Sequence, residues 1–188
     1  MPLSQPAPRR HLHTRRIECC GYRREDGLWD IEGHLVDTKT YNFPNEVRGE
    51  VVAGEPVHDM WLRLTIDDDY LIHGVEATTD AGPYAACPAI TPNFERLTGI
   101  TIGPGWMRTV RQRIGGVEGC THLFELLRPM ATIGYQTLVG ERIREARGMG
   151  ARSSTKGQRP RHIGSCHMYR TDGDLVRRHW PEYYTGPQ

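Results

Sequence analysis

The sequence lacks any long apolar run, and no segment approaches the roughly 20 residues that a helix needs to cross a bilayer. Only 37% of its 188 residues are hydrophobic, and the mean hydropathy is −0.59. These values are typical of a water-soluble protein, so a membrane is not an expected partner.

The sequence also lacks an excess of one charge. Its 24 Lys and Arg residues face 23 Asp and Glu residues, which leaves a formal net charge of +1. That balance argues against general attraction to nucleic acid or to an anionic membrane. The exception is the Arg-, Gly- and Ser-rich stretch from Glu141 to Arg161, which could contact phosphates but is too poor in apolar residues to fold alone. A solvated linker is the favoured interpretation.

A secretory leader is not recognisable, because the basic N-terminal residues are not followed by an apolar segment. We therefore expect a cytoplasmic protein. Its five cysteines, an odd number, are spread from Cys19 to Cys166. In a reducing compartment such cysteines are core residues, ligands or nucleophiles more often than disulfide partners.

Alternating polarity predicts antiparallel strands in the first half of the chain. Along residues 28–41, Glu32 and His34 fall on a largely polar face opposite an apolar one. Residues 57–80 contain two β-prone runs that flank an Asp triplet, 67–69, and Asp favours tight turns. A strand and a hairpin are therefore expected.

Helical patterns follow the strands. They run from Cys87 to Gly99, from Trp106 to Gly116, and from about Gly119 through Leu138, where Pro129 is expected to introduce a kink. The predicted fold class is α+β, with an antiparallel sheet packed on one face by helices.

The predicted organisation has three parts. Residues 1–147 form a single α+β domain with an extended N-terminus, and residues 148–162 form the linker. Residues 163–188 form a tail that packs on the core and contains a turn at Asp172–Gly173 and a strand-like run. Whether Cys166 and His167 join a site on the core is left open.

Two cysteines stand where helices are expected to begin. Cys120 lies at the junction of a glycine-rich turn and an apolar helix, and Cys87 precedes Pro88. Unpaired amides and the helix dipole stabilise thiolates at such positions, although a small capping residue near the core is the plainer alternative. His58 and Asp59 open the predicted hairpin. Together His58, Asp59, Cys87 and Cys120 suit mononuclear zinc or iron, whereas magnesium and calcium prefer oxygen ligands alone.

The order of these elements from Glu55 to Thr137 resembles the scaffold proteins of iron–sulphur cluster assembly. In that family three cysteines and an aspartate bind zinc or the nascent cluster. Asp59, Cys87 and Cys120 match three of these ligands, whereas the first cysteine is absent and His58 stands one position later. The resemblance implies the scaffold fold and a metal site. The whole chain, including HTRRIECCGYRREDGLWDIEGHLVDTK, also resembles a bacterial family of unknown function.

Two functional hypotheses follow. The first is a metal-dependent lyase or hydrolase that acts on a small molecule, with an aromatic substrate suggested only by the available Trp and Tyr residues. Glu32 or His34 would transfer protons, and His122 would join the site as a catalytic group or replace a ligand. A solvated strand face is the alternative for Glu32 and His34. The second hypothesis is a non-catalytic metal-binding scaffold or adaptor. A homo-oligomer is compatible with both.

Overall fold

Four long antiparallel strands form the main sheet, in the order β1-β2-β5-β6. The computed structural model describes residues 3–148, 159–160 and 162–187. A short hairpin of two further strands is inserted between β2 and β5. The strand bounds are β1 His13–Arg23, β2 Trp29–Lys39, β3 Phe43–Asn45, β4 Gly49–Val51, β5 Pro56–Ile66 and β6 Ile72–Ala81.

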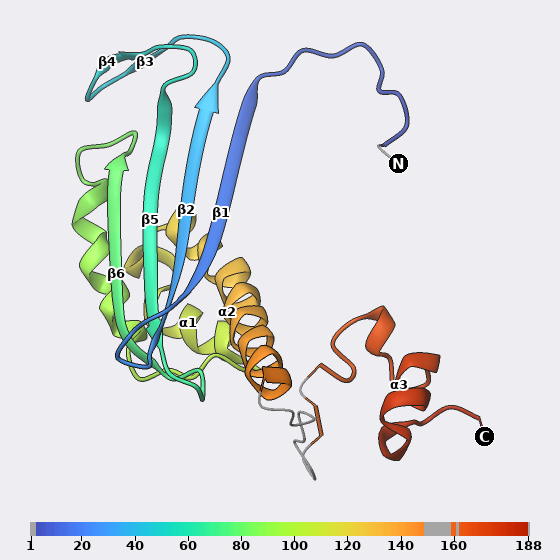
Figure 1. The fold of residues 1–188 in the computed structure, drawn as a ribbon. Coiled ribbons are helices and arrows are strands. Elements are labelled where there is room, and N and C mark those ends of the chain that lie inside the picture. Colours follow the sequence, from blue (N-terminus) through green and yellow to red (C-terminus); the bar gives the residue numbers. More distant parts are fainter. Residues whose placement is uncertain (1–2, 149–158, 161, 188) are drawn as a thin grey trace. The chain divides into compact units, whose positions relative to one another are not determined.

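The helices that follow the sheet cover one of its faces (Figure 1). The longest, α2, carries Pro129 within it. The arrangement confirms the predicted α+β class and its antiparallel sheet. The helix bounds are η1 Cys87–Leu97, α1 Trp106–Ile114, η2 Gly116–Glu118 and α2 Thr121–Gly148, where η denotes a 3-10 helix.

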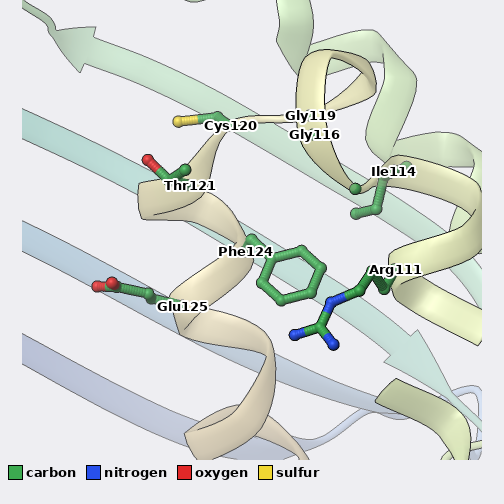
Figure 2. A pocket seen from close by; sticks show the side chains of 9 residues that line it. Arg111, Ile114, Gly116, Gly119, Cys120, Thr121, Phe124 and Glu125 are labelled. Atoms are coloured by element: carbon green, nitrogen blue, oxygen red, sulfur yellow. The ribbon is translucent and has the colours of Figure 1, made fainter. Parts of the chain in front are cut away.

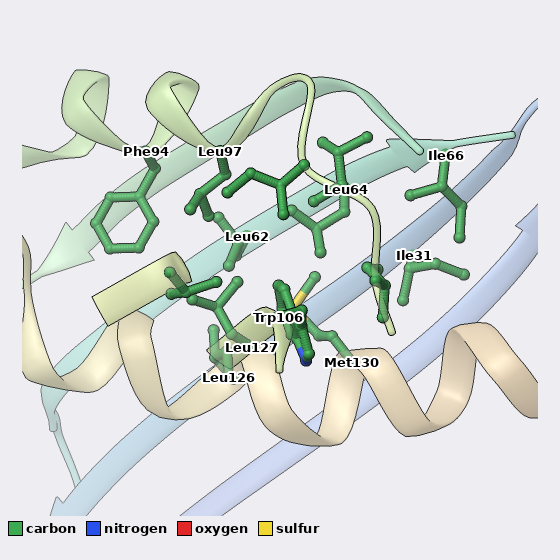
Figure 3. Packing of buried hydrophobic residues seen from close by; sticks show 14 of the residues in the cluster. Ile31, Leu62, Leu64, Ile66, Phe94, Leu97, Trp106, Leu126, Leu127 and Met130 are labelled. Atoms are coloured by element: carbon green, nitrogen blue, oxygen red, sulfur yellow. The ribbon is translucent and has the colours of Figure 1, made fainter. Parts of the chain in front are cut away.

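The core fills the space between the sheet and these helices (Figure 3). Strand β2 alternates between buried and half-buried residues along most of its length, as a strand with one covered face does. Close contact with α2 uses glycine: a Cβ added at Gly33 would lie 2.7 Å from the Met130 sulphur. The labelled residues of the core are Ile31, Leu62, Leu64, Ile66, Phe94, Leu97, Trp106, Leu126, Leu127 and Met130.

The hairpin turn confirms the local role predicted for the Asp triplet. The Asp67 carboxylate accepts hydrogen bonds from the backbone N–H groups of Asp69 and Leu71, at 2.8 and 3.0 Å. It also lies 2.7 Å from Nε2 of His73. These contacts stabilise the turn between β5 and β6, so the Asp67 carboxylate has a structural role.

The first helical segment differs from the prediction in type. Residues Cys87–Leu97 form a 3-10 helix, whereas the pattern predicted a conventional helix over this region. Pro88 stands in the first turn, where an α-helix does not use the N–H, but Pro92 lies inside the segment and interrupts an α-helical ladder. The chain takes tighter 3-10 turns there, as short connecting segments often do.

The chain divides into two compact units, Met1–Glu141 and Arg142–Gln188. In the second, α3 (Asp174–His179) occupies the run that was predicted to be strand-like, so that prediction is wrong. The run buries Val176, and the basic residues Arg177 and Arg178 in its last turn suit a helix C-terminus. The second unit also contains η3 His167–Tyr169 and η4 Pro181–Tyr183.

The boundaries drawn from composition stay predictions. Most of the predicted linker, residues 148–162, lies outside the described residues, and the packing of residues 163–188 on the core is likewise untested. No helix in the described ranges is both long and apolar enough to cross a membrane.

Candidate metal centre

The centre is built around Asp37, a fully buried carboxylate on the helix-covered face of β2. Arg15 donates two hydrogen bonds to it, from Nε to Oδ1 at 2.8 Å and from Nη2 to Oδ2 at 2.7 Å. His13 Nε2 donates to Oδ1 at 3.1 Å, and His58 Nδ1 donates to Oδ2 at 2.9 Å. A buried charge is tolerated only when it is paired in this way.

These donors keep the carboxylate ionised. Burial alone would raise the pKa of Asp37, but hydrogen bonds from Arg15, His13 and His58 and the charge of Arg15 hold it well below its usual range. Asp37 is therefore a hydrogen-bond acceptor at any physiological pH.

Strand pairing and helix packing bring two histidines to this carboxylate. Asp37 and His58 are direct partners in the β2–β5 register, and a register shift follows immediately between Asp37 and Thr38. His122 lies in the first turn of α2 and stacks on His58, with ring centroids 3.7 Å apart. Asp37, His58 and His122 each offer one ligand atom, and these three atoms lie within 4.8 Å of one another.

Both histidines favour the neutral state. Burial lowers the pKa of His58, and the neighbouring His122 lowers it further, against the opposing effect of Asp37. Burial also lowers the pKa of His122, with a further contribution from the charge of Arg15. Because neutral imidazole is the form that binds metal ions, both rings are in the protonation state that a metal ligand requires.

Polar groups surround this group on the α2 side. Arg15 forms an ion pair with Glu125 in addition to its contacts with Asp37. The Cys120 thiol lies 3.9 Å from Nδ1 of His122 and 3.9 Å from the Met60 sulphur. Cys120 directly precedes α2, and its carbonyl accepts a hydrogen bond from the Phe124 N–H at 2.9 Å, so it stands at the helix start as the sequence indicated.

The structure brings together only some of the predicted metal ligands. His58 and His122 meet, and Cys120 lies beside them, but Asp59 and Cys87 are outside the Asp37 group, the one such group among the described residues. Neighbouring residues of a strand point to opposite faces, so His58 and Asp59 cannot share one site. Cys87 is the first residue of η1, which follows β6. A Cβ added at Gly82 would lie 2.9 Å from the Cβ of Cys87.

The predicted acid–base residues lie on the opposite face of the sheet from His122. His34 Nε2 contacts the Asp59 carboxylate at 2.7 Å, and its ring stacks on Trp61 with centroids 3.7 Å apart. Glu32 accepts a hydrogen bond from Arg63 Nε at 2.7 Å. Their separation from the centre follows from the same alternation: in β2, residues 32 and 34 share a face that Asp37 does not.

Sequence reasoning missed the carboxylate at the middle of the centre. Asp37 falls on the apolar face of the alternating 28–41 pattern, where a charge needs partners. A charged residue on that apolar face was the signal in the sequence that could have pointed to this carboxylate. By contrast, Arg15 and His13 carry no local signal, because their role depends on the pairing of β1 with β2.

A cavity of about 280 Å³ lies over the start of α2 (Figure 2). Its lining includes Arg111, Cys120, Phe124 and Glu125, but it does not include Asp37 or either histidine of the centre. The cavity therefore borders the neighbours of the centre rather than the ligand atoms themselves.

Comparison with known proteins gives one match. Residues 13–136 match the model of a family described as protein of unknown function (DUF2889). No curated protein and no solved structure matches the chain, so the resemblance to iron–sulphur scaffold proteins gains no support. The matched region contains all four of the long strands, α1 and the first half of α2, together with the whole centre. The chain belongs to the DUF2889 family of proteins of unknown function.

Proposed function

We propose that the chain is a metal-dependent enzyme, a cytoplasmic lyase or hydrolase that acts on a small molecule through one zinc or iron ion. The supporting observation is the approach of three ligand atoms, from Asp37, His58 and His122, to within 4.8 Å of one another. Two imidazoles and one carboxylate are a ligand set of catalytic zinc sites and of non-haem iron enzymes.

The number of ligands favours catalysis over a purely structural role. Structural zinc sites are closed by four protein ligands, whereas catalytic sites keep a position for water or substrate. Three ligands leave at least one position open. An ion there would polarise a substrate oxygen or lower the pKa of bound water, which suits hydrolysis and lyase chemistry.

The surrounding side chains have definite tasks in this proposal. Since the Asp37 carboxylate only accepts hydrogen bonds, His58 carries its ring proton on Nδ1. For an ion to bind at Nδ1, that proton must move to Nε2. Arg15 and His13 remain on Asp37 and fix its orientation, as supporting hydrogen bonds do for metal-binding carboxylates.

The test is direct metal binding. Protein purified without oxygen would be titrated separately with Zn²⁺, Fe²⁺ and Co²⁺, with elemental analysis of the bound metal and the visible absorption of Co²⁺ as readouts. We expect one ion per chain, and at least tenfold weaker binding in His58→Gln and in His122→Gln. Absence of bound metal above background in the wild type would refute the proposal.

The sheet offers a matched control. His34 also pairs with a carboxylate, Asp59, and also stacks on an aromatic ring, but on the opposite face. His34→Gln should therefore bind metal like the wild type. Equal losses in His34→Gln and His122→Gln would indicate general destabilisation instead of a site at Asp37.

A metal-binding scaffold without catalysis is the second candidate, and the open coordination position separates the two. Azide or cyanide added to the Co²⁺-loaded protein should change its visible spectrum if a position is open. If neither anion changes the spectrum, the coordination shell is closed, which contradicts the proposed enzyme and favours the scaffold.

A further inference from the structure

Strand β1 forms one edge of the sheet, and within the described part of the chain no strand pairs with its outer side (Figure 1). At the opposite edge, the start of β6 is paired. Beside β6, the N–H of Ile72 donates to Ile100 at 2.9 Å, and the N–H of Gly99 donates to Ile72 at 2.8 Å. An open edge presents unpaired N–H and C=O groups, which proteins usually cover or pair.

The side chains at the middle of this edge are suited to pairing. Ile17 is 41% exposed, a large apolar residue at the surface. On either side of it, Arg16 and Glu18 are exposed and form no ion pair within the described residues. The three residues thus offer one apolar group and two opposite charges with no local partner.

We propose that two copies of the chain associate through β1, paired antiparallel about Ile17 in a continuous eight-stranded sheet. In this register Ile17 lies opposite Ile17 of the second copy. Arg16 of each copy lies opposite Glu18 of the other, so the two-fold axis produces two cross-strand ion pairs. The partner is a second copy of this chain because the edge is complementary to itself.

The charges select this register over its neighbours. Side chains that lie opposite one another share a face, so a symmetric pairing is centred on a single residue. Centring on Arg16 would place that arginine against its own copy, and centring on Glu18 would do the same for the glutamate. Like charges directly opposite each other are unfavourable, so both slips are disfavoured.

The test is charge exchange in the full chain, with mass measured by light scattering after size exclusion and the dissociation constant measured by sedimentation. The wild type should be a dimer. Arg16→Glu and Glu18→Arg should each raise the dissociation constant at least tenfold, because each places like charges opposite each other twice. The double variant R16E/E18R restores both pairs in reversed order and should dimerise like the wild type.

Glu46→Arg provides the matched control. Glu46 is exposed in the turn between β3 and β4 and lies outside the β1 edge. It should leave the dimer intact, and circular dichroism should show that every variant is folded. A monomeric wild type, or a double variant as weak as either single one, would overturn the proposal. The association does not depend on the metal, so it can fail or hold independently of the proposed enzyme.

Discussion

His58 and His122 lie ring against ring, with centroids 3.7 Å apart and planes inclined by 30°. The contact joins β5 to the first turn of α2. The centre therefore forms only when the helix has packed on the sheet. Both rings are partly buried, and two charged imidazoles at this distance would repel each other. Protonation of both histidines at once is therefore unfavourable.

The first prediction concerns pH. The pKa values of His58 and His122 are lowered in the folded state, so between their unfolded value of about 6.5 and their folded values the unfolded chain binds more protons. Stability should therefore fall as the pH drops below about 6.5, and it should be fully retained above that value. The measurement is the urea midpoint at pH 7.5 and at pH 5.5.

His122→Asn isolates this effect. Burial also lowers the pKa of His162 in the second unit, which adds a loss of the same sign. Removing His122 deletes one titrating group and relieves His58, so the difference between the two midpoints should shrink relative to the wild type. An unchanged difference would mean that the stacked pair does not govern the acid response.

The second prediction concerns the buried carboxylate. Asp37→Asn removes the charge that pairs with Arg15. It also replaces one carboxylate oxygen with an NH2 group, a donor that would face other donors. We expect a loss of about 3 kcal/mol in the free energy of unfolding, at the lower end for a broken buried ion pair because Arg15 keeps its contact with Glu125. Denaturant unfolding at pH 7.5 measures it.

Asp59→Asn is the comparison for Asp37→Asn. Asp59 also contacts a histidine, His34, but both side chains are partly exposed on the opposite face of the sheet. The expected loss is below about 1 kcal/mol, as for most exposed pairs. Losses of equal size in the two variants would contradict the central role given to Asp37.

The sequence was informative where physical periodicity is local. Alternation along residues 28–41 predicted the two faces of β2, and the Asp triplet predicted the turn of the β5–β6 hairpin. Both depend on neighbours in the chain. An interruption of the α-helical pattern over Cys87–Leu97 could also have been anticipated from Pro92, which lies inside the segment.

The centre itself depends on pairings that local patterns do not determine. Placing His58 against Asp37 requires the β2–β5 register, and placing His122 there requires the packing of α2. The predicted ligand set joined His58 to Asp59 because both open the predicted hairpin. Strand geometry separates adjacent residues instead, and it sends Asp59 to His34 on the other face.

The third prediction concerns the close approach of β1 and α2 at Gly21. A Cβ added at Gly21 would lie 2.9 Å from the Cβ of Thr137, whose branched side chain has little freedom to move away. Gly21→Ala should therefore cost about 1–3 kcal/mol of stability through overpacking. Adding Thr137→Ala removes the nearest branch atoms and should recover part of the loss.

Gly140→Ala is the control for Gly21→Ala. Gly140 lies within α2, and a Cβ added there would meet no atom within 4 Å. Alanine should stabilise the helix at that position by about 0.5–1 kcal/mol. Urea midpoints of the variants give the comparison, and a Gly21→Ala protein as stable as the wild type would show that the sheet and helix separate easily at this point.

The fourth prediction links zinc to stability. An ion that binds only the folded centre stabilises it by mass action, by about 2.7 kcal/mol when free zinc is 100 times the dissociation constant. Neutral imidazoles are required, so this gain should persist below pH 6.5 and decrease only as the pH falls through the lowered folded-state pKa values of His58 and His122. Thermal unfolding with and without zinc measures it. His34→Gln should show the full gain and His122→Gln little of it, because only His122 lies within ligand distance of Asp37 and His58. A gain that survives in His122→Gln would place the zinc elsewhere on the folded chain, for example on its cysteines, and would separate zinc binding from this centre.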